Sequence, residues 1–122
     1  ERAKQAQDII FELQDKLVYK ELLNAQLYYN LGNYMGNNYQ SAIITAQNAL
    51  KEYPYTRYKE TLSMLILKSK YQEAVQSIEE KKPERFRDVI DEYYSFINDY
   101  PSGEYSKEAE NIFKVANKYV KD

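Results

Sequence analysis

The residues best suited to acid–base chemistry in this sequence are two groups of neighbouring carboxylates. One group is Glu79-Glu80, and the other is Asp88-x2-Asp91-Glu92. Paired carboxylates catalyse proton transfer when their surroundings separate their pKa values. In hydrophilic helical segments the same residues are more typical of a solvated surface and of first-turn charge that favours the helix dipole. We therefore expect both groups to be surface features.

The sequence does not contain the residues that other kinds of catalysis require. The chain contains no Cys and no His, which removes thiolate nucleophiles, the commonest general base and the commonest transition-metal ligands. It also contains neither a phosphate-binding glycine loop nor a nucleophile elbow. The sequence therefore predicts that the protein is not an enzyme and uses no cofactor or metal.

The most basic segment, Lys81–Arg87, does not predict a nucleic-acid site. Between Glu79 and Asp88, four basic residues are balanced by four acidic residues. Binding to a polyanion depends on unopposed positive charge, because much of the affinity comes from counterion release. We expect no nucleic-acid partner.

The overall composition favours one helical domain. The chain has 122 residues, of which 43% are hydrophobic and 30% charged, with a formal net charge of −2. Three Gly and three Pro provide few turns, which favours long helices over many short strands. The longest aliphatic run is Met64–Leu67, far short of the ~20 residues that cross a bilayer. Because the first residue is Glu1 in a helix-like stretch, we expect the chain to be a fragment of a longer protein.

Residues 1–32 have a helical pattern with two apolar stripes. Ile10, Leu13 and Leu17 form the first stripe, and the second consists of Val18, Leu22, Ala25 and Tyr29. The apolar side of the helix therefore shifts around the axis from the first stripe to the second. This shift predicts either one long helix that packs on two neighbours or two helices that meet near Asp15-Lys16. Gly32 and Gly36, with the nearby asparagines, predict the turn that follows.

An apolar stripe with helical spacing occurs twice, 47 residues apart. The first copy lies in a predicted helix over 39–52 that ends before Pro54, and the second ends before Pro101. The matched positions are Tyr39, Ala42, Ile43, Ala46, Ala49, Leu50 and Tyr53, and then Phe86, Val89, Ile90, Tyr93, Phe96, Ile97 and Tyr100. Further helices are predicted over 57–80 and 104–120, with Pro83 in the first turn of the helix between them.

The repeat predicts an all-α fold, an α-solenoid of tetratricopeptide-like antiparallel helix pairs with about five helices. The spacing Ala42-x3-Ala46-x2-Ala49-x4-Pro54 fits the second helix of such a unit, whereas HEAT-type repeats have a period nearer 47 but not this spacing. We expect a single domain over 1–122. Its parts are an N-terminal helix or helices (1–32), a repeat (39–80), and a repeat with a capping helix (83–122). Because the 47-residue spacing is longer than a tetratricopeptide unit, we expect the helix after Pro54 to be extended, with about 24 residues.

The order of these residues resembles a known family. Three segments carry the resemblance: Leu13-x3-Leu17-x3-Glu21-x3-Ala25-x2-Tyr28-Tyr29, Tyr39-x2-Ala42, and Glu52-Tyr53-Pro54-x-Thr56. Together they resemble the C-terminal half of the BamD (YfiO) family, particularly its Bacteroidetes-type members. That family comprises lipid-anchored tetratricopeptide-repeat subunits of the outer-membrane β-barrel assembly machine. The resemblance covers nearly the whole chain and is strongest from Leu13 to Thr56.

The resemblance implies a non-catalytic protein–protein interaction adaptor at the periplasmic face of the outer membrane. It implies a lipid anchor upstream of Glu1, and partners that include BamA-like POTRA domains and other subunits of the assembly machine. One departure is Thr45, which stands where many members carry an arginine. The alternative is a generic tetratricopeptide module that binds peptides in another envelope or cytosolic complex, with Lys20, Asn24 and Lys59 as residues for gripping a carboxylate.

The candidate partner-binding residues lie in the predicted turns or in the first residues of the helices that follow them. Large amphipathic side chains favour interfaces, and a rigid array presents its loops for binding. The alternatives are that the tyrosines cap the core and that the asparagine turn is only a connection. One tyrosine of each adjacent pair, Tyr28-Tyr29 and Tyr93-Tyr94, could also face a groove. The candidates for partner binding are Tyr34, Asn37, Tyr55, Arg57, Tyr58 and Tyr105.

Overall fold

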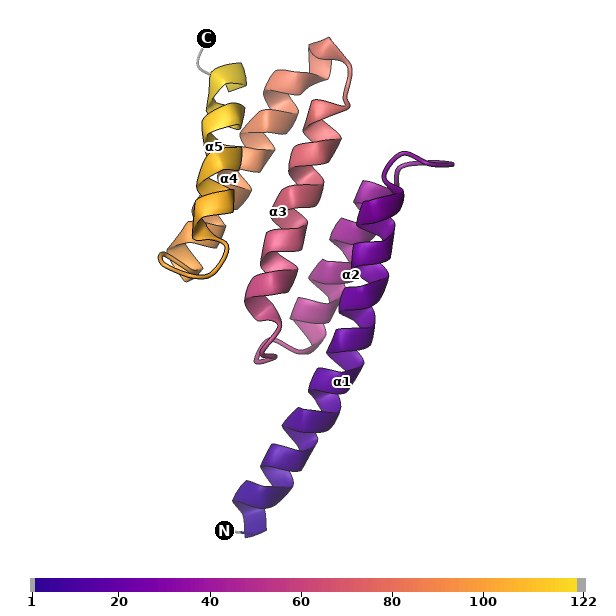
Figure 1. Cartoon of the computed structure of the whole chain (residues 1–122), viewed down its shortest axis with the longest axis vertical. Coiled ribbons are helices and arrows are strands. Elements are labelled where there is room, and N and C mark those ends of the chain that lie inside the picture. The colour runs from indigo at the N-terminus through magenta and orange to yellow at the C-terminus, as the bar shows by residue number, and fades with distance from the viewer. Residues whose placement is uncertain (1, 121–122) are drawn as a thin grey trace.

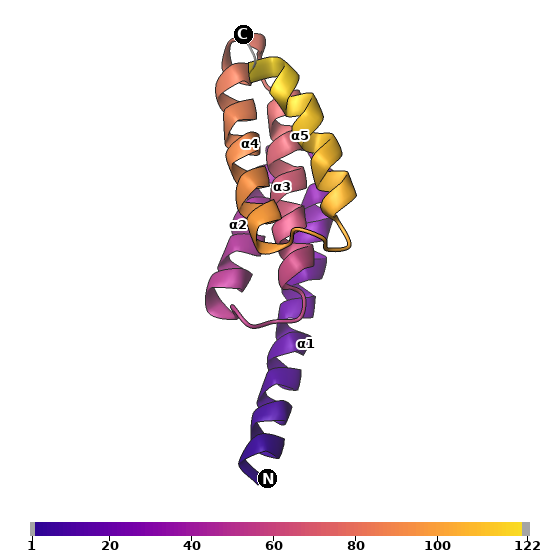
Figure 2. The same ribbon diagram turned by 90° about the vertical axis from the view of Figure 1, so that its left-hand side faces the viewer.

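The protein is an all-helical array in which successive helices pack side by side in antiparallel order. The computed structural model describes residues 2–120, and no strand occurs within them. Figures 1 and 2 show the arrangement, which is consistent with a tetratricopeptide-like solenoid. The elements are α1 (Arg2–Leu31), α2 (Asn38–Glu52), α3 (Lys59–Val75), the short 3-10 helix η1 (Glu79–Lys81), α4 (Lys82–Asp99) and α5 (Ser106–Val120).

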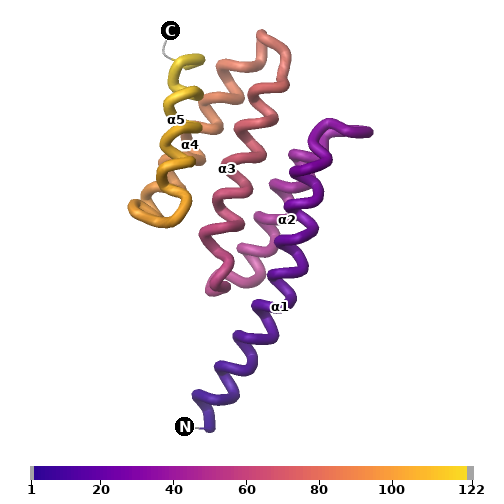
Figure 3. The backbone as a smooth tube through the Cα atoms, in the orientation of Figure 1, coloured from indigo at the N-terminus to yellow at the C-terminus, as the bar shows by residue number. Residues whose placement is uncertain are grey.

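Helix α1 is a single continuous helix, which decides between the two predictions for residues 1–32. It packs against α2 and α3 through a row formed by Val18, Leu22 and Ala25. The helix therefore contacts two neighbours, as one of the two predictions requires, but neither neighbour buries the stripe of Ile10, Leu13 and Leu17, which is 53–55% exposed. The physical reason is the length of α1: its N-terminal half extends past the ends of the other helices (Figures 1 and 3).

The repeated stripes on α2 and α4 face the interior, as the spacing predicts. Their C-terminal corners have nearly the same backbone geometry, with φ −128° and ψ 68° at Tyr53 and φ −134° and ψ 66° at Tyr100. In each corner the tyrosine N–H donates to a carbonyl four residues earlier, that of Ala49 or Phe96. A proline follows in both copies and prevents the helix from continuing. The two copies of the sequence repeat therefore also have the same backbone conformation at their C-terminal corners.

Helix α3 is shorter than predicted, at 17 residues instead of about 24. It ends at Val75 because the next turn uses other hydrogen bonds. The Ser77 hydroxyl donates to the Ala74 carbonyl at 2.6 Å, and Ile78 has an extended backbone that leads into η1. Pro83 then lies in the first turn of α4, as the sequence predicts.

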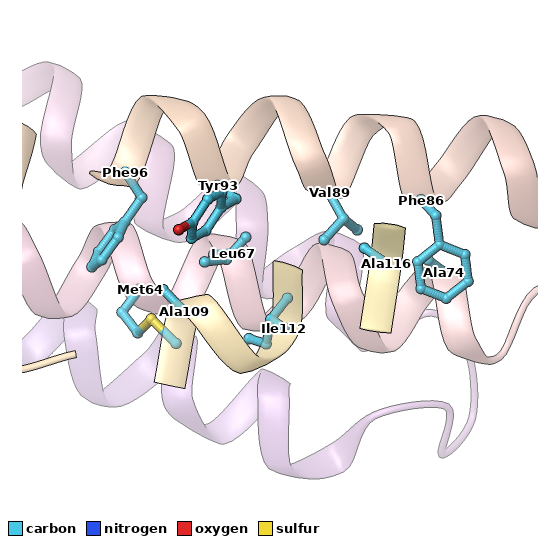
Figure 4. Packing of buried hydrophobic residues seen from close by; sticks show 10 residues of the cluster. All are labelled: Met64, Leu67, Ala74, Phe86, Val89, Tyr93, Phe96, Ala109, Ile112 and Ala116. Carbon is cyan, nitrogen blue, oxygen red and sulfur yellow. The ribbon is translucent and has the colours of Figure 1, made fainter. Parts of the chain in front are cut away.

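The interior consists of two hydrophobic clusters that share α3. The first joins α1, α2 and α3 and includes Leu62, Leu65 and Ile66. The second joins α3, α4 and α5 and includes Met64 and Leu67 (Figure 4). Five of the six residues from 62 to 67 are therefore buried, because α3 has a neighbour on two opposite sides.

Aromatic rings fill the cluster between α4 and α5. Phe86 stacks on Tyr119 with ring centroids 4.1 Å apart, and Tyr93 stacks on Phe113 at 4.6 Å. Small residues, Ala109 and Ala116, let α5 approach closely. None of the helices within residues 2–120 is long and apolar enough to span a bilayer.

Candidate protein-interaction site

A hollow of about 220 Å³ opens between α1, α3 and the turn that precedes α5. Its base is formed by Met64 and Leu65, whose side chains belong to different hydrophobic clusters. Aromatic and polar groups form the walls, namely Gln26, Tyr29 and Asn30 from α1, Thr61 and Lys68 from α3, and Tyr105. The helices that form it are the first helices of successive pairs, so the hollow lies on the face that α1, α3 and α5 share.

Lys68 provides the positive charge of the hollow. Its Nζ lies 4.9 Å from the centroid of the Tyr29 ring and 3.9 Å from Oε1 of Glu108 on α5. The Tyr29 hydroxyl is protonated at neutral pH and can donate a hydrogen bond, and burial raises its pKa further above the ordinary value of 10.0. The cation is held at the edge of the hollow by an aromatic face on one side and a carboxylate on the other.

Tyr105 is the one candidate partner-binding residue that lines this hollow. Its hydroxyl lies 3.3 Å from Oγ1 of Thr61, and its backbone N–H donates to Glu60 at 3.3 Å. The ring also packs against the cluster of α3, α4 and α5. Tyr105 thus combines the two roles that the sequence left open, because it packs on the core and also lines the hollow.

Tyr34 and Asn37 lie together in the turn between α1 and α2, away from the hollow. The Tyr34 side chain is 68% exposed. Asn37 has a structural role: its Oδ1 accepts from the N–H of Gln40 at 3.2 Å and caps α2, while its Nδ2 donates to Glu73 at 2.8 Å. This turn is therefore anchored to α3, and Tyr34 projects from it.

Tyr55, Arg57 and Tyr58 lie at the opposite end of the array, in the turn between α2 and α3 (Figure 1). Tyr55 is 85% exposed. The Arg57 guanidinium lies 5.2 Å from the Tyr58 ring centroid and 3.7 Å from the Asp15 carboxylate. Tyr58 packs against the cluster of α1, α2 and α3. The six candidates therefore fall in three separate places.

Sequence reasoning missed most of the hollow. Gln26 and Asn30 are four residues apart, as are Thr61 and Leu65, and this spacing places each pair on one side of its helix. This four-residue spacing was the only signal in the sequence that could have indicated these residues as part of a site. The residues proposed for gripping a carboxylate, Lys20, Asn24 and Lys59, do not line the hollow. Lys20 instead lies in a separate hollow between α1 and α2.

One carboxylate of each acidic group pairs with a lysine. Glu79 pairs with Lys82 at 2.9 Å, and Glu92 pairs with Lys70 at 2.8 Å. In the part of the chain that the structure describes, no cluster of acidic residues could hold a metal ion. Comparison with known proteins does not assign a family: no family model matches the chain, and no curated protein matches its sequence significantly.

Proposed function

We propose that this protein is a non-catalytic adaptor that binds another protein through the face formed by α1, α3 and α5. The observation that supports this proposal is the hollow at Lys68, which gathers a cation, amide side chains and tyrosine hydroxyls above an apolar base. Its volume of about 220 Å³ is below the ~300–1,000 Å³ of typical small-molecule sites. A hollow of this size fits one side chain of a docked protein segment.

The chemistry of the walls suggests how such a segment would be held. Gln26 and Asn30 can donate and accept hydrogen bonds with a peptide backbone. Lys68 can bind a carboxylate once Glu108 turns away, and Met64 with Leu65 can receive an apolar group. Because the hollow is built on helices, little reordering is needed when a partner binds.

The resemblance to the BamD family supports a more specific form of the proposal. The chain would be the C-terminal tetratricopeptide portion of an outer-membrane assembly lipoprotein, anchored by a lipid upstream of Glu1 and facing the periplasm. Its partners would be BamA-like POTRA domains and other subunits of the assembly machine. Thr45, which is half-buried on α2, stands where many family members carry an arginine. A contact that those members make through the arginine would be absent in this protein.

Calorimetric titration with the POTRA segment of the BamA homologue from the same organism tests this form. We expect micromolar or tighter binding, and Lys68→Ala should weaken it at least about tenfold if the hollow is central to the contact. Lys114→Ala is the matched control, because Lys114 also pairs with a glutamate but lies on the exposed side of α5. Full affinity in Lys68→Ala, with loss in Tyr55→Ala/Tyr58→Ala, would move the site to the α2–α3 turn. No binding would contradict the POTRA partner.

The alternative is a peptide-binding module in another complex, and the cation of the hollow favours it. Fluorescein-labelled peptides that end in a free carboxylate or in an amide provide the probe. Binding that requires the free carboxylate and is lost in Lys68→Ala would support this function. Equal binding of both peptides to both proteins would exclude it.

A further inference from the structure

The ion pair between Lys68 and Glu108 at the edge of the hollow is loose. The distance from Lys68 Nζ to Glu108 Oε1 is 3.9 Å, which is too long for a hydrogen bond. The Glu108 side chain is 51% exposed, so water competes for its carboxylate. By contrast, Lys70 of the same helix lies 2.8 Å from Glu92 on α4 and donates a hydrogen bond to it. The protein can therefore open the pair of Lys68 and Glu108 at little cost.

Glu60 shows how firmly a glutamate at a similar place can be held. Glu60 and Glu108 each follow a lysine in the first turn of their helices, α3 and α5. The Glu60 carboxylate accepts the backbone N–H of Tyr105 at 3.3 Å and lies against Gly103, where an added Cβ would clash with it. The turn before α5 thus fixes Glu60, whereas Glu108 faces the end of a flexible lysine. Glu108 is the freer of the two to turn toward water.

The walls of the hollow carry a positive charge and no negative charge. Among the residues that line it within 2–120, Lys68 is the one charged side chain. The hydroxyls of Tyr29, Thr61 and Tyr105 can donate hydrogen bonds to an anion. A carboxylate is complementary to these walls, and Glu108 shows that a carboxylate reaches the vicinity of Lys68.

We propose that the hollow binds an acidic side chain of the partner, and that Glu108 occupies Lys68 until this side chain displaces it. Because it names the group that enters the same hollow, this assignment rests on the proposed function. In the free protein Glu108 competes with any incoming carboxylate, which favours segments that also make the backbone and apolar contacts of the hollow. The displaced Glu108 is solvated without a further change in the fold, since its side chain is already half exposed.

The amides of α1 indicate that the acidic residue lies within an extended segment and not at a chain end. Gln26 and Asn30 are one helical turn apart, about 6 Å along the axis. Alternate residues of an extended chain are about 6.6 Å apart, so a segment that runs along α1 can pair its backbone with both amides. A segment that ended in a carboxylate at Lys68 would reach fewer of these groups.

A random dodecapeptide library displayed on phage supplies the probe. The intact chain is the target, and the Lys68→Ala protein removes peptides that bind elsewhere. We expect the retained peptides to share an aspartate or a glutamate at one position. One of them is then synthesised with both ends blocked, so that no terminal carboxylate is present. A second version carries the corresponding amide in place of the shared acidic residue.

Calorimetric titration of the two peptides measures the competition. Glu108→Gln should bind the acidic peptide about two- to fivefold more tightly than the parent protein does, because this is what loss of an exposed ion pair is worth. Its affinity for the amide peptide should not change. Glu110→Gln is the matched control, since Glu110 lies on the same helix, pairs with Lys114 at 3.6 Å and changes the net charge equally. We expect it to bind both peptides as the parent does.

Equal effects of Glu108→Gln and Glu110→Gln would overturn the competition, because net charge alone would then explain the change. Retained peptides that share a basic residue, or that bind equally well as the amide version, would overturn the acidic ligand. A library that yields no peptide dependent on Lys68 would overturn both. The POTRA titration tests the proposed function separately. A protein that binds POTRA but selects no such peptide would retain the adaptor function and lose this ligand.

Discussion

Ser69 is a buried polar group whose removal should stabilise the protein. The residue is fully buried in α3, and within residues 2–120 its hydroxyl oxygen has no hydrogen-bond partner. An unpaired buried hydroxyl costs about 1–3 kcal/mol of desolvation, and serine is about 0.5 kcal/mol less favourable than alanine inside a helix. Ser69→Ala removes both costs and gives up only the dispersion contacts of one oxygen, which are worth a few tenths of a kcal/mol.

We therefore expect Ser69→Ala to increase the free energy of unfolding by about 1–2 kcal/mol, which for a chain of this size raises Tm by roughly 4–8 °C. Urea denaturation followed by circular dichroism gives the free energy, and a thermal scan gives Tm. Ser95→Ala on α4 is the matched control, because Ser95 is exposed in a helix and should show the propensity term alone. A Ser69→Ala protein that is less stable than the parent would refute this reasoning and would mean that the hydroxyl is hydrogen-bonded in solution.

Three further changes test other parts of the fold. Thr56→Val should cost about 1–3 kcal/mol in urea denaturation, because the Thr56 hydroxyl donates to the part-buried Asp15 carboxylate at 2.6 Å; an unchanged midpoint would show that this bond adds nothing. Gly32→Ala should cost about 1–2 kcal/mol by the same assay, since Gly32 has a φ of +58° and an added Cβ would lie 2.8 Å from the Tyr39 hydroxyl. Burial raises the pKa of Tyr93 above its ordinary value of 10.0, so the unfolded chain ionises first and stability should fall as pH rises above about 10. Tyr93→Phe should flatten that fall in an alkaline titration, and an identical slope would exclude this tyrosine as a cause.

The sequence predicted the helices whose apolar spacing is regular. The stripes of α2 and α4 predicted both the helices and their buried sides, because a single row of apolar residues at a period of 3.6 has one interpretation. The extent of α3 was not predictable in this way, since its C-terminal end depends on a hydrogen bond between the Ser77 hydroxyl and the Ala74 carbonyl. A serine followed by an isoleucine and two glutamates does not by itself end a helix.

The candidate site was predictable only in part. Tyr105 was found because it follows a proline corner. Lys68 was not found, because the buried residues of α3 do not form a single row that would separate a polar side of the helix from an apolar one. The hollow forms where α1 and α3 approach each other, and periodicity within one helix carries no information about which neighbouring helix covers it. The same limit explains Ile10 and Leu13: their spacing shows an apolar face, whereas their exposure depends on where the neighbouring helices end.

Met64 and Leu65 are adjacent in sequence, yet one belongs to the cluster with α4 and α5 and the other to the cluster with α1 and α2. Both are at the base of the hollow. A ligand bound there would contact residues of both clusters, so its binding would require both halves of the array to be folded. Its binding energy would therefore act against separation of the two halves, and a partner held at Lys68 would make a quasi-linear assembly of repeats unfold as one cooperative unit.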